Sequence, residues 1–312
     1  MPVFEITKNN LKKLESRDFK LEKDLQHLLE ENLSEVFNVR FIASEFSTGN
    51  IHSGRIDTLG LSEDGNPVII EYKKVESSQL INQSLYYLSW LNDHHGDFEI
   101  AVQNKLGSEI EIDWATVRVI CIAPNFKKYD LHAANIMGAN IELWQYKVYE
   151  NKIFHLEEVL QRTKAEQSVT GIKISDKASV QREAGKKAAV TRATGTYTVE
   201  EHLDGKPKPI LELFENIRQY ILDLDESIDE SPKKNYIAYK ITQNFACVEI
   251  HQKNLLIYLK LNFNEVPPIS FGRDMTDIGH FGTGDFELRV TSLDELEKAK
   301  SYIEMSYQKM GA

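Results

Sequence analysis

The segment from Ile56 to Lys73 constrains the fold more than any other part of this 312-residue chain. It reads apolar, then Ser62-Glu63-Asp64-Gly65-Asn66-Pro67, then apolar again, which is the pattern of a β-hairpin. We expect a three-residue loop, Glu63-Asp64-Gly65, with Gly65 in the left-handed conformation that suits a residue without a Cβ. Ser62 and Asn66 would then close the loop.

This register predicts that Asp57 lies directly opposite Glu71, with both side chains on one face. The two-residue period of a strand adds Arg55 and Lys73 to that face. Two carboxylates that face each other repel, so the two basic side chains or a bound cation must offset their charge. A hard cation, Mg²⁺ or Mn²⁺, held by carboxylates beside a lysine is the minimum set for phosphodiester hydrolysis. The alternative is a partly buried ion-pair network without catalysis.

Two predicted helices flank the hairpin. Residues 21–29 read as an amphipathic helix whose apolar side consists of Leu21, Leu25, Leu28 and Leu29. Glu22 lies next to this stripe and can reach over the sheet. After the hairpin, Ser77 or Ser78 can cap a helix on which Gln83 and Tyr87 stand four residues apart. An amide and a phenol can both donate hydrogen bonds to phosphate oxygens.

Four segments together resemble a known family: Glu22-Lys23-x-Leu25-Gln26, Gly54-Arg55-Ile56-Asp57, Glu71-x-Lys73 and Gln83-x-x-x-Tyr87. They are similar to the motifs of the PD-(D/E)XK nuclease superfamily, and most similar to the catalytic domain of NucS-type endonucleases. The resemblance implies a restriction-endonuclease-like α/β domain over residues 1–160, with a mixed sheet flanked by helices. It also implies metal-dependent hydrolysis of nucleic acid by an endonuclease, with DNA as the first substrate to consider.

The resemblance implies a role for each motif residue. The catalytic set would be Glu22, Asp57, Glu71 and Lys73, and the metal ligands for Mg²⁺ or Mn²⁺ would be Asp57, Glu71 and Glu22. Lys73 would orient the attacking water and help to deprotonate it. Substrate would be bound by Arg55, Lys74, Gln83 and Tyr87. The alternative is a nucleic-acid-binding or protein-interaction module that keeps the nuclease fold and does not cleave. NucS-type enzymes carry a DNA-binding, dimerising domain before the nuclease domain, and nothing similar precedes Glu22 here, so mismatch or flap specificity is not implied.

The remainder of the chain predicts a second domain. Residues 161–196 contain few large apolar residues and recurring Lys and Arg, which indicates a basic, solvated linker. A basic tether that lies on nucleic acid is the alternative. Residues 197–312 predict a smaller α+β domain, with a helix opened by Pro209, several strands and a last helix from Leu293. This domain resembles a C-terminal domain of unknown function often labelled "predicted transport protein". Its glycine-rich residues 278–285 precede a strand, which favours an inter-strand turn over a phosphate site.

Composition limits the partners. A net charge of −11 and a pI near 5.4 repel a polyanion on average, so contacts to nucleic acid must come from local positive charge. No stretch approaches the roughly twenty apolar residues that span a membrane, and the first residues lack the pattern of a signal peptide. We therefore expect a cytoplasmic protein without a membrane partner; the sequence leaves an oligomer open.

Cys121 and Cys247 lie in apolar runs, which predicts buried, reduced thiols.

Overall fold

The computed structural model describes residues 2–49, 54–77, 79–108, 110–136, 140–150, 152–159 and 197–310. The chain divides into two compact units, Met1–Val180 and Gln181–Ala312. The first is α/β and the second, smaller unit is α+β, so the predicted fold classes are confirmed. The predicted linker, residues 161–196, lies outside the described residues, and the domain boundaries derived from it stay a prediction.

The first unit is built on a seven-stranded mixed sheet with the strand order β3-β8-β7-β6-β5-β4, and β9 pairs with β8. β6, β7 and β8 run parallel, whereas β4, β5 and β6 form an antiparallel meander. The elements in chain order are β1 (Phe4–Thr7), β2 (Asn10–Lys13), β3 (Ser16–Arg17), α1 (Glu22–Glu30), α2 (Leu33–Phe37), β4 (Val39–Ser47), β5 (Arg55–Ser62), β6 (Pro67–Tyr72), α4 (Gln79–Asp93), α5 (His95–Leu106), β7 (Arg118–Ala123), α6 (Lys128–Ile136), β8 (Ile141–Tyr149) and β9 (Phe154–Glu158).

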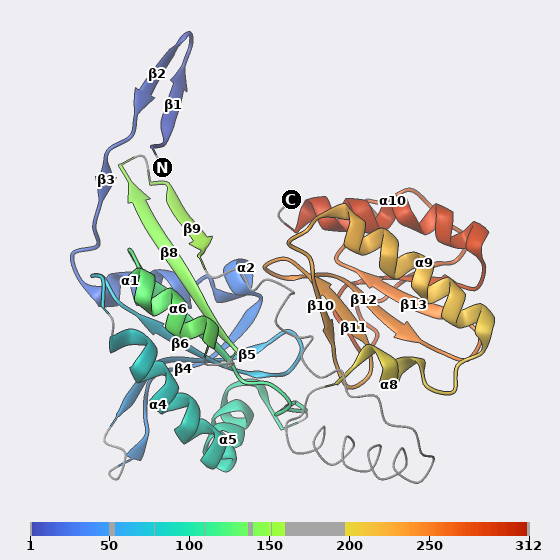
Figure 1. Ribbon diagram of the computed structural model, residues 1–312, viewed down its shortest axis with the longest axis horizontal. Helices are drawn as coiled ribbons and strands as arrows, with labels where there is room; N and C mark the ends of the chain where they lie inside the picture. Colours follow the sequence, from blue (N-terminus) through green and yellow to red (C-terminus); the bar gives the residue numbers. More distant parts are fainter. Residues whose placement is uncertain are drawn as a thin grey trace. The chain divides into compact units, whose positions relative to one another are not determined.

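Both faces of this sheet are covered, which explains why its central strands are continuously apolar. In β7, Val119 and Cys121 pack toward the cluster that includes α4 and α5. Ile120 and Ile122 of the same strand pack toward the cluster that includes α1 and α2. Figure 1 shows these helix pairs against the sheet of the first unit. Alternate side chains of one strand therefore belong to two separate cores.

The β5–β6 hairpin has the predicted loop and register. The N–H of Ser62 donates to the carbonyl of Asn66 at 2.8 Å, and Gly65 has a φ of 79°. Thr58 pairs with Ile70, which places the next pair, Asp57 and Glu71, opposite each other. The expected position of the two carboxyl groups is thus set by a three-residue turn.

The predicted apolar stripe of α1 was wrong at two of its four positions. Leu25 and Leu29 are buried, whereas Leu21 is 61% and Leu28 is 40% exposed. Gln26 takes part of the buried side instead, with 4% of its surface exposed. The helix therefore presents a polar side chain to the sheet, where Gln26 donates a hydrogen bond to β5.

The second unit is a six-stranded antiparallel sheet in the order β10-β11-β12-β13-β15-β14. The elements are α8 (Val199–Leu203), α9 (Lys208–Leu224), β10 (Asp229–Pro232), β11 (Ile237–Lys240), β12 (Asn244–Ile250), β13 (Leu255–Leu259), β14 (Gly272–Asp274), β15 (Phe286–Val290) and α10 (Leu293–Lys309). α9 and α10 cover one face through a single core (Figure 1). The glycine-rich segment lies between the paired strands β14 and β15, as expected, but the link spans residues 275–285 and is longer than the tight turn that we predicted.

Two predictions from composition can be compared with the structure. Cys121 and Cys247 are both buried free cysteines, as expected. Of the helices that the structure describes, none is both long enough and apolar enough to cross a bilayer.

The close packing of β4 on β5 gives a testable prediction. A Cβ at Gly60 would collide with Cγ1 of Val39 and lie 3.2 Å from the carbonyl oxygen of Arg40. Because the buried, β-branched Val39 cannot turn aside, we expect Gly60→Ala to lower the free energy of unfolding by about 1–3 kcal/mol. Gly96→Ala in α5, where a Cβ meets nothing within 4 Å, is the matched control and should not destabilise the protein. Equal urea midpoints for the two variants would contradict this packing.

Candidate active site

Asp57 and Glu71 face each other where β5 and β6 begin to part. The main-chain pairing of the two strands ends at Thr58 and Ile70. Beyond this point, hydrogen bonds from main-chain N–H groups to the two carboxyl groups connect the strands. The N–H of Asp57 donates to Oε1 of Glu71 at 3.0 Å, and the N–H of Tyr72 donates to Oδ2 of Asp57 at 3.1 Å. Each carboxyl group is therefore fixed by a main-chain N–H of the opposite strand.

The environment of this pair disfavours two negative charges. Glu71 is fully buried, and burial followed by the charge of Asp57 holds the pKa of Glu71 well above its usual range. Burial also raises the pKa of Asp57, although the Tyr72 N–H and the charge of Lys73 act in the opposite direction. Oε2 of Glu71 is buried and finds no hydrogen-bond partner among the described residues. An orphaned buried oxygen beside a second carboxyl group is costly unless a cation or a proton satisfies it.

Lys73 lies beside the pair and is held by Glu22. Its Nζ donates to Oε1 of Glu22 at 3.1 Å and to the carbonyl of Tyr72 at 2.9 Å. Burial lowers the pKa of Lys73, but the hydrogen bond and charge of Glu22 outweigh this effect, so the net pKa is raised. A lysine with a raised pKa stays cationic and cannot accept a proton near neutral pH. The raised pKa favours an electrostatic and orienting role for Lys73, and its expected help in deprotonating water stays a prediction.

Glu22 is engaged with lysines. While Oε1 accepts from Lys73, Oε2 accepts from the main-chain N–H of Lys74 at 3.0 Å. Across the described ranges, no group of three or more His, Cys, Asp or Glu side chains is arranged to hold a metal ion. The third-ligand role of Glu22 stays a prediction, and its direct side-chain contact is to Lys73. Asp57 and Glu71 alone still suit Mg²⁺, which proteins commonly bind through one or two carboxylates plus water and substrate phosphates.

Tyr87 joins α4 to the first residues of β5. Its hydroxyl accepts a hydrogen bond from the N–H of Arg55 at 3.1 Å and from Nε2 of Gln83 at 3.2 Å. Gly54 allows this approach, because a Cβ there would lie 2.7 Å from Cε1 of Tyr87. Tyr87 is only 5% exposed, so its main contact is with the protein itself. Gln83 is half-buried above it and is the more accessible member of the expected substrate-binding pair.

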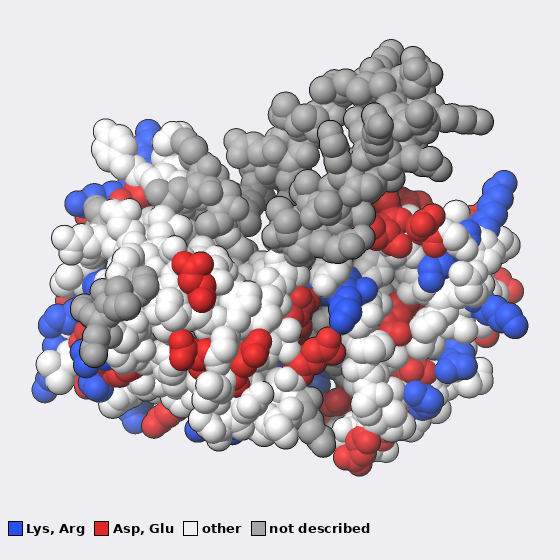
Figure 2. Space-filling view, turned by 90° about the horizontal axis from the view of Figure 1, so that it is seen from below, with Lys and Arg blue, Asp and Glu red and all other residues white. Residues whose placement is uncertain are grey.

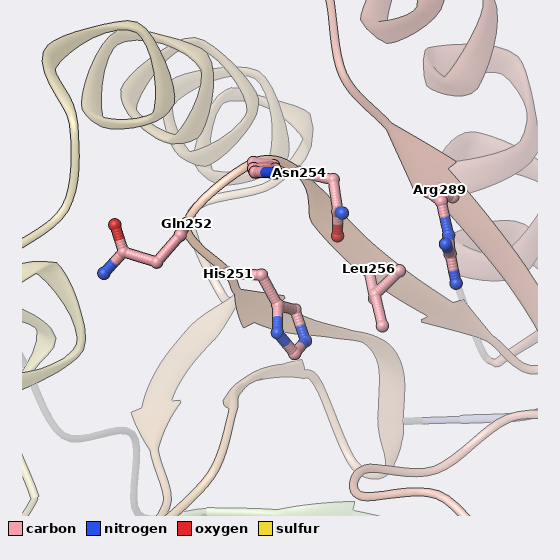
Figure 3. A pocket seen from close by; sticks show the side chains of 6 residues that line it. His251, Gln252, Asn254, Leu256 and Arg289 are labelled. Carbon is pink, nitrogen blue, oxygen red and sulfur yellow. The ribbon is translucent and has the colours of Figure 1, made fainter.

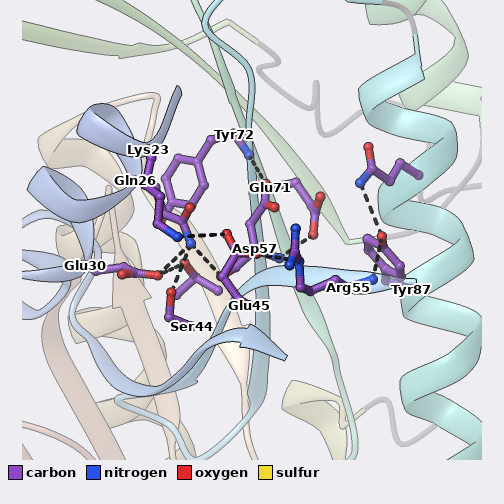
Figure 4. Close-up of polar contacts among 12 residues, drawn as sticks. Lys23, Gln26, Glu30, Ser44, Glu45, Arg55, Asp57, Glu71, Tyr72 and Tyr87 are labelled. Carbon is purple, nitrogen blue, oxygen red and sulfur yellow. Dashed lines mark hydrogen bonds and ion pairs between the residues drawn. The ribbon is translucent and has the colours of Figure 1, made fainter. Parts of the chain in front are cut away.

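The two basic residues that we expect to bind substrate are exposed. The side chain of Arg55 is 67% exposed and its Nε pairs with Oε2 of Glu45. Lys74 is exposed, and its Nζ donates to the carbonyl of Lys20 at 2.9 Å. Figure 4 shows Asp57 and Glu71 between the side chains of α1 and Tyr87 of α4. The structure thus brings all the predicted motif residues to one end of the β5–β6 hairpin.

Sequence reasoning missed the role of Gln26. Its Nε2 donates to the carbonyl of Asp57 at 2.8 Å, and lies 3.0 Å from Oε1 of Glu30 and 3.1 Å from Oγ of Ser44. These contacts tie α1, which carries Glu22, to the strand that carries Asp57. A glutamine beside the apolar side of an amphipathic helix was the available signal, since a buried amide needs partners.

Glu45 was also missed. It lies in β4 between the pairs Ser44–Thr58 and Phe46–Ile56, which places it opposite Asp57. Its φ of 54° is rare for a residue with a Cβ, and such strain is concentrated at functional sites. The carboxylate pairs with Arg55 and lies 3.9 Å from Nζ of Lys23. No sequence pattern marks a strained backbone angle at a glutamate.

Comparisons with known proteins place this chain in a family. A family model described as "Domain of unknown function (DUF5655)" matches residues 199–309. The chain is 33% identical over 311 residues to an "Uncharacterized protein" of Haemophilus influenzae (strain ATCC 51907 / DSM 11121 / KW20 / Rd), and the match covers 98% of this chain and 99% of that protein. The protein therefore belongs to the same family as the Haemophilus influenzae protein. The expected C-terminal domain of unknown function is confirmed, and nothing bears on the transport label.

Three solved structures show a weaker likeness, each covering 46% of this chain and 64% of the other, which is less than two thirds of its length. The "Structure of EndoMS-dsDNA2 complex" matches with a TM-score of 0.25 at 16% identity. A repair endonuclease from Pyrococcus abyssi matches with 0.22 at 17%, and EndoMS in its apo form with 0.24 at 18%. TM-scores of this size carry no functional conclusion.

The raised pKa values of the carboxyl pair predict how stability depends on pH. Because the folded carboxyl groups hold protons more tightly than unfolded ones, the free energy of unfolding falls as pH rises from the ordinary carboxyl range through the raised pKa values. At pH values below the ordinary range, both states are protonated and the effect vanishes. Without divalent cations, we expect Glu71→Gln to be more stable than the wild type by about 1 kcal/mol or more at neutral pH, and equal to it at about pH 4.

Denaturant titrations at several pH values measure this difference. The exposed Glu15 offers the matched control, Glu15→Gln, which should follow the wild type at every pH. If Glu71→Gln were no more stable than the wild type at neutral pH, the proposed strain in the carboxyl pair would be absent.

Proposed function

We propose that this member of the family hydrolyses phosphodiester bonds of nucleic acid with the help of Mg²⁺ or Mn²⁺. The observation that carries the proposal is the opposed, partly buried pair of Asp57 and Glu71 beside the cationic Lys73. The motif resemblance to NucS-type endonucleases makes DNA the substrate to test first.

The carboxyl pair has the chemistry of a cation site. Asp57 and Glu71 would hold the metal, since their oxygens are hard ligands and Oε2 of Glu71 is buried without a partner in the described part of the chain. A bound divalent cation would stabilise both carboxylates, polarise the phosphate and lower the pKa of a coordinated water. With a cation bound, the attraction of each carboxylate to the shared ion would offset the repulsion between the two.

Lys73 supplies a positive charge that does not depend on the metal. Its side chain is 21% exposed, so the ammonium group can reach a phosphate oxygen at the surface of the site. As charge builds on those oxygens, a fixed ammonium group stabilises them without reorganisation. Glu22 is the positioning residue for this step, because it accepts from Nζ of Lys73 and from the N–H of Lys74.

Nucleic acid must be attracted locally, because the whole chain carries a net charge of −11. Basic and acidic side chains are interspersed on the face of the molecule seen in Figure 2. Near the carboxyl pair, however, the side chains of Lys23 and Arg55 are 57% and 67% exposed, and Lys74 is exposed as well. Charges within a screening length of roughly 8 Å decide such contacts at physiological salt. Phosphate would compete with Glu45 for Lys23 and Arg55 on binding.

A cleavage assay tests this function. We expect the wild type to cut plasmid and oligonucleotide DNA when Mg²⁺ or Mn²⁺ is added and to stop when EDTA is added. Asp57→Asn removes a metal ligand and Lys73→Met removes the fixed charge, so each should lower the cleavage rate by about 100-fold or more. The rate should also fall steeply with added salt, because phosphate contacts release counterions.

The controls make the same chemical changes at exposed positions elsewhere in the unit. Asp93→Asn at the end of α4 and Lys128→Met at the start of α6 should retain the wild-type rate. Equal activity in Asp57→Asn and the wild type would assign the cleavage to a contaminant. Salt-sensitive binding without metal-stimulated cleavage in the wild type would favour a non-cleaving binding module.

A further inference from the structure

The sheet of the second unit has one face that none of the described helices, α8, α9 and α10, covers. Side chains at Val248, Ile257 and Leu288 belong to the core beneath α9 and α10. The alternate positions point the other way. They include Cys247, Glu249, Leu256, Tyr258, Glu287 and Arg289, which the strand register sets side by side across β12, β13 and β15.

This second face buries two carboxylates, which is unusual for a small domain. Glu249 is 7% and Glu287 is 2% exposed, and the hydroxyl of Tyr258 lies close to both. Burial, with the charge of the two glutamates, raises the pKa of Tyr258. Oε1 of Glu249 is buried and has no hydrogen-bond partner among the described residues. Buried acids in this arrangement need basic partners nearby.

Each buried acid holds a basic side chain that reaches the surface. Nε2 of His251 lies 2.9 Å from Oε2 of Glu249. Nη2 of Arg273 lies 3.3 Å from Oε2 of Glu287, and Nη2 of Arg289 lies 3.9 Å from Oε1. The side chains of His251 and Arg289 remain 48% and 54% exposed. The buried glutamates therefore fix the positions of His251 and Arg289, while the rest of each basic side chain faces solvent.

A hollow of about 420 Å³ lies above these groups, at the turn between β12 and β13. It is lined by His251, Gln252, Lys253, Asn254, Leu256 and Arg289. Figure 3 shows the side chains of His251, Asn254, Leu256 and Arg289 extending side by side in the same direction. Gln252 is turned toward Gly205, to whose carbonyl it donates at 3.3 Å. None of these six lining residues carries a carboxylate.

The lining matches the two parts of a nucleotide. Arg289 offers a guanidinium and Lys253 an ammonium group, both of which recognise phosphate, and Asn254 adds a neutral amide. The flat ring of His251 and the side chain of Leu256 offer a surface on which a base can stack. The hollow is shallow and open to solvent, so a bound nucleotide would keep much of its surface exposed.

We propose that this hollow binds a nucleotide, with its phosphate on Arg289 and Lys253 and its base against His251 and Leu256. The nucleotide is either free or part of a strand, since both present the same phosphate and base. This site lies within the second unit and does not depend on the nuclease proposal. The buried glutamates act as positioning residues that hold the basic side chains in place.

Calorimetric titration of the full chain in EDTA tests the site, because EDTA removes the divalent cations that the first unit would need. The probes are a nucleoside 5′-monophosphate, the matching nucleoside, inorganic phosphate and a short single-stranded oligonucleotide. We expect the monophosphate to bind more tightly than the nucleoside or phosphate alone. Lys253→Ala and Arg289→Ala should each weaken it by about tenfold.

Lys298→Ala on α10, an exposed lysine on the covered side of the sheet, is the matched control and should bind as the wild type does. Lys253 is exposed in a turn, so its loss reports on binding even if Arg289→Ala disturbs folding. Oligonucleotide binding that is tighter than that of the monophosphate and is weakened by Lys253→Ala identifies a strand as the ligand of this hollow, and equal binding identifies the free nucleotide. The proposal is overturned if no nucleotide binds, if Lys253→Ala leaves binding unchanged, or if inorganic phosphate alone binds as tightly as the monophosphate.

Discussion

The repulsion between two carboxyl groups at the end of one hairpin is the constraint on which the first unit depends. A three-residue turn closed by Ser62 and Asn66 fixes the register, and that register leaves Asp57 no position except opposite Glu71. Neither carboxyl group turns toward solvent, where water would screen the repulsion. It fixes both with main-chain N–H groups and buries one of them completely. We therefore expect the carboxyl pair to destabilise the fold when no cation is bound and to stabilise it when a cation is bound.

The neighbouring elements act on this pair from three sides. α1 brings Glu22 to Lys73 and Gln26 to the carbonyl of Asp57, so one helix positions both the lysine and the strand. α4 holds the start of β5 through Tyr87. β4 adds a strained glutamate, Glu45, which holds Arg55 near the surface. The layers of the sheet therefore serve to keep a few charged groups at one end of the β5–β6 hairpin.

The hairpin and its facing carboxyl groups could be predicted from the sequence because turn residues and a two-residue period determine them locally. The burial of Gln26 could not, since the apolar pattern of α1 pointed to Leu21 and Leu28, and only the position of β5 decides which side of the helix is covered. Glu45 was beyond prediction for a similar reason, because its φ arises from the pairing of β4 with β5. The hydrogen bond between Lys73 and Glu22 could not be predicted either, because it depends on a contact between elements that are distant in the sequence, and the expected roles of both residues stay predictions. The grouping of Glu249 and Glu287 on one face of the second sheet could not be predicted either, because it depends on which strands are neighbours in the sheet.

The central claim is that Asp57 and Glu71 share a divalent cation, and calorimetric titration of the metal-free protein with Mn²⁺ tests it most directly. We predict saturable binding whose heat depends on the ionisation enthalpy of the buffer, because a carboxyl group with a raised pKa must release its proton to the solution when the metal binds. Asp57→Asn should abolish this binding. Mn²⁺ that binds Asp57→Asn as tightly as the wild type would contradict the claim.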